Sequence, residues 1–262
     1  MKVIEYIQLE HELNRISNDA AGDVSLYAKT PDGTIAIRPN EVIRSASILK
    51  VPVAMACLAA ADRGEIDLDT LLKIVEPVGG SGVLAYLTGV EDITLRDALT
   101  LSIIVSDNTA ANLVIDHIGL ECIQSFFRQV GVEHSLVSRK FMDYDALAKG
   151  FDNVATAREM VLFLQCLDPA SEFLSLTSKQ LLKMIMRDQQ LIDKLPAYQP
   201  IFNETLIIGN KTGSLPGIEH DIAYFEKDNR RVDIAVLTSN WVHNHDGQKT
   251  IAAIGQAVIE YL

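Results

Sequence analysis

Residues 47–64 read SILKVPVAMACLAAADRG, an apolar run with its polar residues near the two ends. A helix that is apolar on every side is buried in the core rather than laid on the surface. Pro52 stands near the start, where its missing N–H costs little, and Gly64 stands where a helix commonly stops. We therefore predict a buried helix from Ser47 to about Gly64, against which the rest of the chain packs.

The segments on either side of this helix differ in their periodicity. Alternating, strand-like residues occur near both chain ends, whereas helical spacing dominates residues 93–195. The pattern predicts an α+β fold, with an antiparallel sheet formed from both chain ends and flanked by helices, plus an all-helical lobe. The expected strands lie around residues 24–28, 35–37, 205–208, 222–225 and 232–237, and the expected terminal helices around residues 2–18 and 251–261.

The two ends of the chain are expected to form one lobe and the middle another. We assign residues 1–42 and 196–262 to the α/β lobe, and residues 43–195 to the helical lobe. Together they would form one catalytic unit, because a cleft between two such lobes is a natural place for an active site.

Composition and charge narrow the classes of partner. The chain has 262 residues, of which 48% are hydrophobic, and a net charge of −12. An acidic surface repels phosphate backbones, so no nucleic-acid partner is expected. Acidic residues interrupt the first ten positions, which excludes a signal-peptide core there, and no apolar stretch is long enough to span a bilayer. We expect a cytoplasmic monomer or dimer with no membrane partner, or a secreted protein if a leader has been removed.

Ser47 and Lys50 form the only Ser-x-x-Lys sequence in the chain. A spacing of three residues on a helix puts both side chains on one face, one turn apart. A serine hydroxyl is a weak nucleophile that needs a base beside it, and a lysine becomes such a base when burial lowers its pKa. On its own, the pair is better explained by a helix N-cap serine followed by a lysine that reaches the surface.

Two further polar clusters follow at residues 106–108 and 211–213. Residues 106–108 read Ser-Asp-Asn and by themselves indicate a helix start, with the serine or the aspartate as its cap. Residues 211–213 read Lys-Thr-Gly and are typical of a strand end before a turn. A cation and a hydroxyl placed together there would also satisfy a substrate carboxylate or carbonyl. Each cluster is common separately, but the three in this order are far more specific.

In this order the clusters resemble the motifs of class A β-lactamases and penicillin-binding serine hydrolases. The resemblance extends from about residue 23 to the end of the chain, since the order of strands and helices also agrees. It implies that Ser47 is the acylated nucleophile, Lys50 its proton acceptor and Ser106 the group that passes a proton to the leaving atom. It also implies no metal and no organic cofactor. The remaining implied roles, substrate binding and a backbone oxyanion hole, fall on Asn108, Lys211, Thr212 and, for the oxyanion hole, Ser47 with Ser214.

The chain departs from that family's pattern in two places. Class A β-lactamases use a glutamate in an E-x-x-L-N motif to activate the deacylating water. Here the motif is absent, and Phe141 stands roughly where the glutamate would be, with Asp143 or Asp145 as shorter and shifted replacements. The acyl-enzyme should therefore form faster than it is hydrolysed, so that it persists. In place of a carboxylate-binding arginine the chain offers His220 and Asp221, either a structural strand pair or a different specificity element.

Three functions stay open on these grounds. The first is hydrolysis of a β-lactam amide with slow deacylation. The second is a D-amino-acyl peptidase or a small-molecule esterase that uses the same nucleophile. The first and second functions both imply a small-molecule substrate. The third is a non-catalytic binding module on the same fold. A metal site at residues 243–246, which read His-Asn-His-Asp, is not expected because no third cluster of ligands accompanies it.

Overall fold

The computed structural model describes residues 4–200 and 205–262. Within these ranges, five strands form one antiparallel sheet in the order β2-β1-β9-β8-β7, which joins both chain ends as predicted. A β1–β2 hairpin from the N-terminal end pairs through β1 with β9 of the C-terminal meander. The strands are β1 (Asp23–Thr30), β2 (Gly33–Ile37), β7 (Ile207–Leu215), β8 (Ile218–Lys227) and β9 (Arg230–Ser239).

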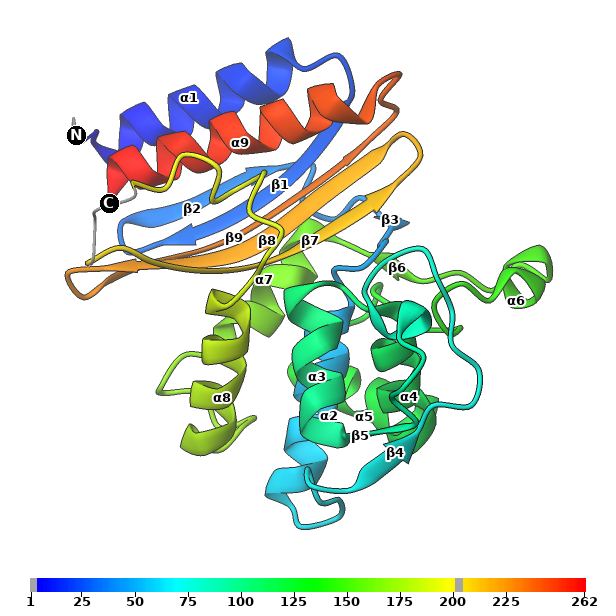
Figure 1. The fold of residues 1–262 in the computed structure, drawn as a ribbon. Coiled ribbons are helices and arrows are strands. Elements are labelled where there is room, and N and C mark those ends of the chain that lie inside the picture. The colour runs from blue at the N-terminus through cyan, green and yellow to red at the C-terminus, as the bar shows by residue number, and fades with distance from the viewer. Residues whose placement is uncertain (1–3, 201–204) are drawn as a thin grey trace.

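One face of the sheet is covered by the two terminal helices, α1 (Tyr6–Asp19) and α9 (Asn244–Tyr261), which lie side by side (Figure 1). The helical spacing of Leu9 and Leu13 places both side chains in the core between α1 and the sheet, where neither is exposed. The helix predicted over residues 2–18 therefore forms, and the part of it at residues 2–3 lies outside the described residues.

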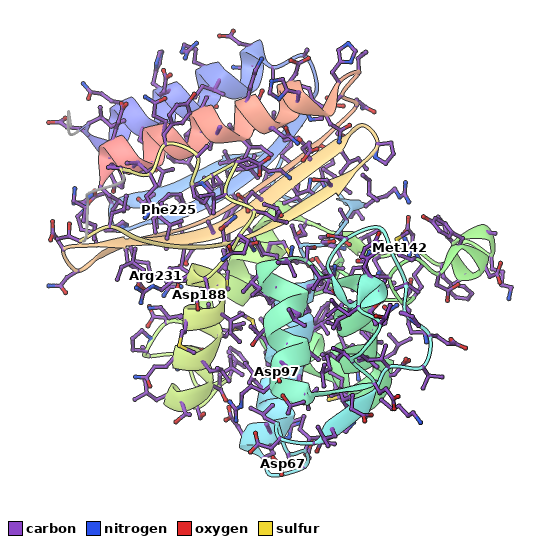
Figure 2. The ribbon with its side chains drawn as sticks, in the orientation of Figure 1. Asp67, Asp97, Met142, Asp188, Phe225 and Arg231 are labelled. Atoms are coloured by element: carbon purple, nitrogen blue, oxygen red, sulfur yellow. The ribbon has the colours of Figure 1, made fainter. Side chains whose placement is uncertain are left out.

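The other face of the sheet packs against the helical lobe (Figure 1). Figure 2 shows Arg231 of β9 on this side, where its guanidinium donates to the carbonyl of Leu164 at 3.0 Å. No helix among the described residues is long and apolar enough to cross a membrane. The lobe contains α2 (Lys50–Asp62), a short 3-10 turn (Leu84–Tyr86), α3 (Leu95–Ile104), α4 (Asn108–Ile118), α5 (Leu120–Val130), α6 (Tyr144–Ala148), α7 (Ala157–Gln165) and α8 (Leu176–Arg187).

Two short ladders interrupt the lobe that was predicted to be all-helical. Strand β3 (Ile43–Arg44) pairs with β6 (Val154–Ala155), and β4 (Leu71–Lys73) pairs with β5 (Asp92–Thr94). Strands of two or three residues are too short to produce a readable alternation, so the sequence pattern misses them.

Helix α2 begins at Lys50 rather than at Ser47, as the apolar run had suggested. Ser47 lies in the preceding turn, where the N–H of Ile48 donates to the carbonyl of Ser45 at 3.3 Å and that of Lys50 to Ser47 at 3.2 Å. Ala46, directly before Ser47, has φ 47°. A left-handed conformation at a non-glycine residue costs of order 1–3 kcal/mol and is often found at functional sites. The turn leaves Ser47 only half-buried, just before a helix that is buried from Lys50 to Ala60.

Strand β7 continues through residues 211–213, which the sequence pattern had placed at a strand end. Its pairing with β8 runs from Ile207 opposite Glu226 to Leu215 opposite Ile218. The turn comes only after Leu215, where Gly217 adopts φ 74°. The Lys-Thr-Gly cluster therefore lies within a regular strand at the edge of the sheet, which holds its backbone straight.

Candidate active site

Lys50 is the centre of a buried hydrogen-bond cluster. Its side chain is 1% exposed. Its Nζ lies 2.6 Å from the carbonyl oxygen of Ser106, 2.8 Å from Oδ1 of Asn108 and 3.2 Å from Oγ of Ser106. Three predicted site residues therefore meet at one nitrogen, and no carboxylate among the described residues is bonded to it.

Burial lowers the pKa of Lys50 well below its usual value, because a charged amine loses its hydration inside the protein. The positive charge of Lys211 lowers this pKa further, while the charge of Asp107 opposes the shift. Lys211 is itself fully buried, and burial lowers its pKa to about 7 against the opposing charge of Asp221. A neutral Lys50 is the form that a general base requires.

Asp107 holds Asn108 and the adjoining loop in place. One of its carboxylate oxygens accepts from the N–H of Ala110 at 2.9 Å, which makes it the N-cap of α4. The other accepts from two N–H groups of loop 79–84 at 2.6 and 2.8 Å. Gly82 of that loop has φ 94°, and a Cβ there would lie 2.2 Å from the Asp107 carboxylate. The capping role predicted for residues 106–108 thus falls on Asp107, and the same side chain fixes the loop over Asn108.

Strand β7 passes directly against the turn that carries Ser47. A Cβ at Gly213 would lie 3.0 Å from the Ser47 nitrogen and 3.1 Å from Cβ of Ala46, so only glycine lets the strand approach this closely. The Lys211 Nζ donates to the carbonyl of Thr212 at 2.7 Å. The side chains of Lys211 and Thr212 are both buried in strand β7. Neither is among the residues that line the cavity beside Ser47.

The cavity beside Ser47, the predicted nucleophile, has a volume of about 250 Å³. Three predicted site residues line it, namely Ser47, Asn108 and Ser214. Much of the remaining wall is apolar and comes from the loop around α6 and from the end of β7. The other lining residues are Arg44, Ala46, Gly80, Ser81, Arg139, Phe141, Met142, Tyr144, Leu147, Asp152, Asn153, Leu215 and Pro216.

Phe141 closes this cavity next to the Lys50 amine. Its ring centroid lies 4.6 Å from the Lys50 Nζ, and the residue is 7% exposed. Asn112 of α4 holds its backbone on both sides, accepting from its N–H at 2.8 Å and donating to its carbonyl at 2.9 Å. An aromatic ring therefore occupies the space beside the amine. The ring belongs to the residue that stands, by sequence, roughly where the family has its glutamate.

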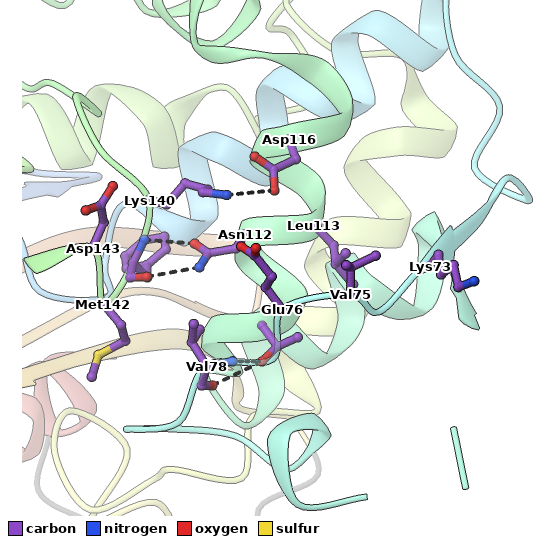
Figure 3. Close-up of a pocket in the computed structure, with 12 residues that line it drawn as sticks. Lys73, Val75, Glu76, Val78, Asn112, Leu113, Asp116, Lys140, Met142 and Asp143 are labelled. Carbon is purple, nitrogen blue, oxygen red and sulfur yellow. Dashed lines mark hydrogen bonds and ion pairs between the residues drawn. The ribbon is translucent and has the colours of Figure 1, made fainter. Parts of the chain in front are cut away.

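Asp143 and Asp145 do not reach the nucleophile's cavity. The Asp143 carboxylate accepts from the N–H of Ala146 at 2.9 Å, which caps α6, and the residue lines a second cavity of about 410 Å³ (Figure 3). Asp145 is exposed in the first turn of α6. Phe141 and Met142 line both cavities and form the wall between them. Neither aspartate is placed to activate a water at the nucleophile, contrary to the replacement that the sequence allowed.

His220 is enclosed within the sheet and does not reach the cavity either. Burial lowers its pKa to about 4, so the ring is neutral at pH 7. Its Nδ1 lies 3.0 Å from the backbone nitrogen of Thr238 and 2.8 Å from the carbonyl oxygen of Glu219, and its Nε2 lies 2.8 Å from the carbonyl oxygen of Arg44. Asp221 is likewise buried and accepts from the N–H of Leu195 at 3.0 Å. Of the two interpretations of this pair, the geometry favours the structural one.

A buried ion pair between Lys194 and Glu219 lies behind the active-site end of β7. Their side chains are 2% and 1% exposed, and the Lys194 Nζ lies 2.5 Å from the carboxylate. Lys194 also donates to the carbonyls of Gly213 and His220, each at 3.0 Å, and Glu219 accepts from Oγ of Ser214 at 2.8 Å. The pair therefore connects the segment before β7 to strands β7 and β8 near Ser47. The sequence analysis singled out neither residue for this contact.

Replacing Lys194 with methionine should lower the free energy of unfolding by about 3–5 kcal/mol, because it leaves the Glu219 carboxylate buried without its cation. Adding Glu219→Gln should recover part of that loss, so that the double change costs less than the sum of the two single changes. Urea denaturation of the wild type, both single variants and the double variant measures the coupling. Additive costs in the four proteins would contradict a direct ion pair.

Three charged residues that line the nucleophile's cavity were also missed by the sequence analysis. Arg44 places Nε 2.7 Å from Oδ2 of Asp152, and Arg139 places a terminal nitrogen 2.8 Å from Oδ1 of the same carboxylate. Arg44 and Asp152 are separated by 108 residues in the chain. Nothing in the spacing of the sequence connects them, since only the pairing of β3 with β6 brings them together.

The groups gathered around Ser47 are hydroxyls, amines, amides, guanidiniums and the single carboxylate of Asp152. Among the described residues, no three His, Cys, Asp or Glu side chains are arranged to hold a metal ion. His245, in the segment considered for a metal, lies in the first turn of α9 with Nδ1 3.4 Å from Oε1 of Gln248.

The sequence and the fold agree with those of a known family. The sequence model of the Beta-lactamase enzyme family matches residues 8–262, and the chain belongs to that family. The solved structure of a β-lactamase from Sphaerobacter thermophilus is 30% identical in sequence and superposes with a TM-score of 0.89, covering 98% of this chain and 97% of that one. The structure of PBP-A is 22% identical and shares the fold with a TM-score of 0.86, covering 100% of this chain and 97% of that one.

Two curated relatives match over different lengths. A β-lactamase from Bacteroides uniformis is 26% identical over 220 residues, which is 79% of this chain and 72% of that protein. A β-lactamase from Rhodobacter capsulatus is 32% identical over 126 residues, which is 46% of this chain and only 42% of that protein. The predicted fold class and the family resemblance are confirmed.

Proposed function

We propose that this chain is a serine hydrolase of the β-lactamase type, which forms an acyl-enzyme at Ser47 with a β-lactam and releases it slowly. The observation that carries the proposal is the buried Lys50 amine, bonded to Ser106 and Asn108 one turn from Ser47. A lysine that is buried without a carboxylate partner is costly to retain for stability alone. A base next to a serine is the function that accounts for it best.

In the acylation step, the Ser47 Oγ attacks the carbonyl carbon of the lactam and its proton passes to the neutral Lys50 Nζ. The oxyanion that forms is stabilised by the backbone N–H groups of Ser47 and Ser214. The Ser47 N–H supports this role, because it donates to no backbone carbonyl among the described residues. The ring C–N bond then breaks, and Ser106 delivers the proton held by Lys50 to the leaving nitrogen. Ester formation at Ser47 and ring opening balance, with no proton gained or lost.

Substrate binding falls on the residues beside this reaction path. Asn108, which lines the cavity, would bind the substrate amide, and Lys211 and Thr212 of the adjoining edge strand would hold its carboxylate. The positive charge of Lys211 also lowers the pKa of Lys50, which favours the neutral amine that a base requires.

Slow release follows from what surrounds the ester. Hydrolysis of an acyl-enzyme requires a base that activates water, and the ring of Phe141 lies beside Lys50 instead. The only carboxylate among the described residues that line the cavity is Asp152, and both its oxygens accept from guanidiniums. A carboxylate held in this way is a weak base, because its anionic form is stabilised.

Intact-protein mass spectrometry with benzylpenicillin, followed over minutes to hours, tests the proposal. We expect a long-lived adduct that peptide mapping locates on Ser47, with no adduct on the Ser47→Ala variant. An unchanged adduct on that variant would refute the assigned nucleophile. Rapid product formation without a lasting adduct would keep the nucleophile and refute slow release.

The same ring of Phe141 favours a second candidate, a D-amino-acyl peptidase or small-molecule esterase. An acyclic leaving group diffuses out after acylation and makes room for water, whereas an opened lactam stays attached. Turnover of a p-nitrophenyl ester or a depsipeptide faster than turnover of nitrocefin would support it. Failure of every serine-directed probe to label the folded protein would instead leave a non-catalytic binding module.

A further inference from the structure

The cavity beside Ser47 carries a net positive charge in a chain whose overall charge is −12. Among the described residues that line it, the charged side chains are Arg44, Arg139 and Asp152, two cations and one anion. The catalytic roles assigned above do not use the excess cation. An uncompensated positive charge in an acidic protein indicates an anionic ligand, because it attracts that ligand locally while the surface repels it.

Arg44 and Arg139 share Asp152 unequally. Arg139 is the more enclosed, with 11% of its side chain exposed, and it donates to Oδ1 of Asp152 through two nitrogens and to the carbonyl of Lys140 through the third. Arg44 is 45% exposed and donates to Asp152 through Nε alone. Its two terminal nitrogens have no acceptor among the described residues. They form the planar pair of donors that binds a carboxylate with two parallel hydrogen bonds.

The backbone of Arg44 is held firmly, three residues before the nucleophile. Its carbonyl lies 2.8 Å from Nε2 of the buried His220. Arg44 is also paired with Val154 across the β3–β6 ladder, and the N–H of Ser45 donates to the carbonyl of Asn153 at 2.9 Å. A guanidinium on a fixed backbone loses less conformational entropy when it binds than one on a loose loop.

Part of the cavity wall is apolar. Met142, Tyr144 and Leu147 come from the loop around α6, and Leu215 and Pro216 come from the end of β7. A ligand that fits such a space has an apolar body and an anionic group at one end.

We propose that Arg44 binds an anionic group on the acyl side chain of the substrate, so that the preferred substrates carry an apolar acyl side chain with a carboxylate. The inference deepens the proposed function and rests on it. The carboxylate assigned to Lys211 and Thr212 belongs to the opposite part of the substrate, and His220 acts as a positioning residue for Arg44.

Two penicillins that differ by one carboxylate test this assignment. α-Carboxybenzylpenicillin has the additional carboxylate on its acyl side chain, and benzylpenicillin does not. The wild type should be acylated faster by the carboxylated compound, and Arg44→Gln should reduce that preference about 10-fold, the expected value of one charge-assisted bidentate contact. Arg63→Gln serves as the matched control, since Arg63 is equally exposed at 46% but pairs with Glu65 at the far end of α2.

The ratio of the two acylation rates separates recognition from structure. If Arg44 only holds Asp152 in place, Arg44→Gln slows both penicillins alike and leaves the ratio unchanged, which would overturn the proposal. Binding of phenylmalonate relative to phenylacetate, measured by ligand-observed NMR, tests the same cation without acylation. If neither penicillin reacts, this binding experiment still decides the proposal. Equal relative binding in the wild type and in Arg44→Gln would overturn it. A loss of relative binding in Arg44→Gln would support it and would mean that the proposed acylation, rather than the role of Arg44, is wrong.

Discussion

Replacing Lys50 with methionine should slow acylation of Ser47 by benzylpenicillin about 10²–10⁴-fold, the usual contribution of a positioned general base. Methionine has a similar length and keeps the buried helix apolar, so the expected loss is chemical. The amine lies within 3.2 Å of acceptors on Ser106 and Asn108, and burial lowers its pKa. Stopped-flow acylation kinetics measure the rate.

The control for this variant is Lys183→Met. Lys183 also lies over an aromatic ring, 5.2 Å from the centroid of Tyr224, but it is ion-paired to Glu226. Glu226 pairs with Ile207 at the start of β7, whereas the turn of Ser47 contacts Gly213 near the other end of that strand. That variant should be acylated at the wild-type rate. Acylation of a folded Lys50→Met protein at the wild-type rate would assign the base to another group.

The role of Lys50 as the base also predicts how the acylation rate changes with pH. Only the neutral Lys50 accepts a proton, so the acylation rate should rise with pH up to the pKa of Lys50, which burial and Lys211 lower. Lys211, whose pKa is lowered to about 7, loses its charge above that pH and with it the hold on a substrate carboxylate. The profile of kcat/KM should therefore fall again above pH about 7. In Lys50→Met the rising limb should disappear.

Replacing Phe141 with glutamate should shorten the life of the penicillin adduct about 10²–10⁴-fold, because it places a base where the structure has a ring. The two hydrogen bonds between the Asn112 side chain and the backbone of residue 141 should hold the new side chain where the Phe141 ring lies, whose centroid is 4.6 Å from the Lys50 Nζ. Time-resolved mass spectrometry after removal of free penicillin measures the decay of the adduct.

Phe141→Gln is the matched control, since it has the shape of glutamate but cannot accept the proton. Equal adduct lifetimes in the folded glutamate and glutamine variants would contradict a deacylation defect at this position. The glutamate should also raise the pKa of Lys50, because an anion stabilises the nearby ammonium. The rising limb of the acylation profile should consequently move to higher pH.

The order of helices and strands could be predicted from the sequence, because burial leaves a period of 3.6 in helices and of 2 in strands. The apolar run after Ser47 and the alternation at both chain ends were enough to predict the sheet and the helical lobe. The reactive groups were equally accessible to motif analysis, since Ser47 and Lys50 are close in the chain and their chemistry depends on residue type. Element ends were less certain, as the later start of α2 and the longer β7 show.

By itself, the sequence determined the order of helices and strands in this protein and singled out Ser47, Lys50 and Lys211 as the proposed nucleophile, base and substrate-binding cation. Only the tertiary structure decided how those groups are tuned. The pKa of Lys50 depends on Lys211, which lies 161 positions later in the chain (211 − 50). The charge of the cavity depends on the contact between Arg44 and Asp152. The Lys194–Glu219 pair and the enclosure of His220 likewise arise from packing between separate segments. Periodicity reports only whether a residue is buried, whereas its partners across space are set when the lobes pack together.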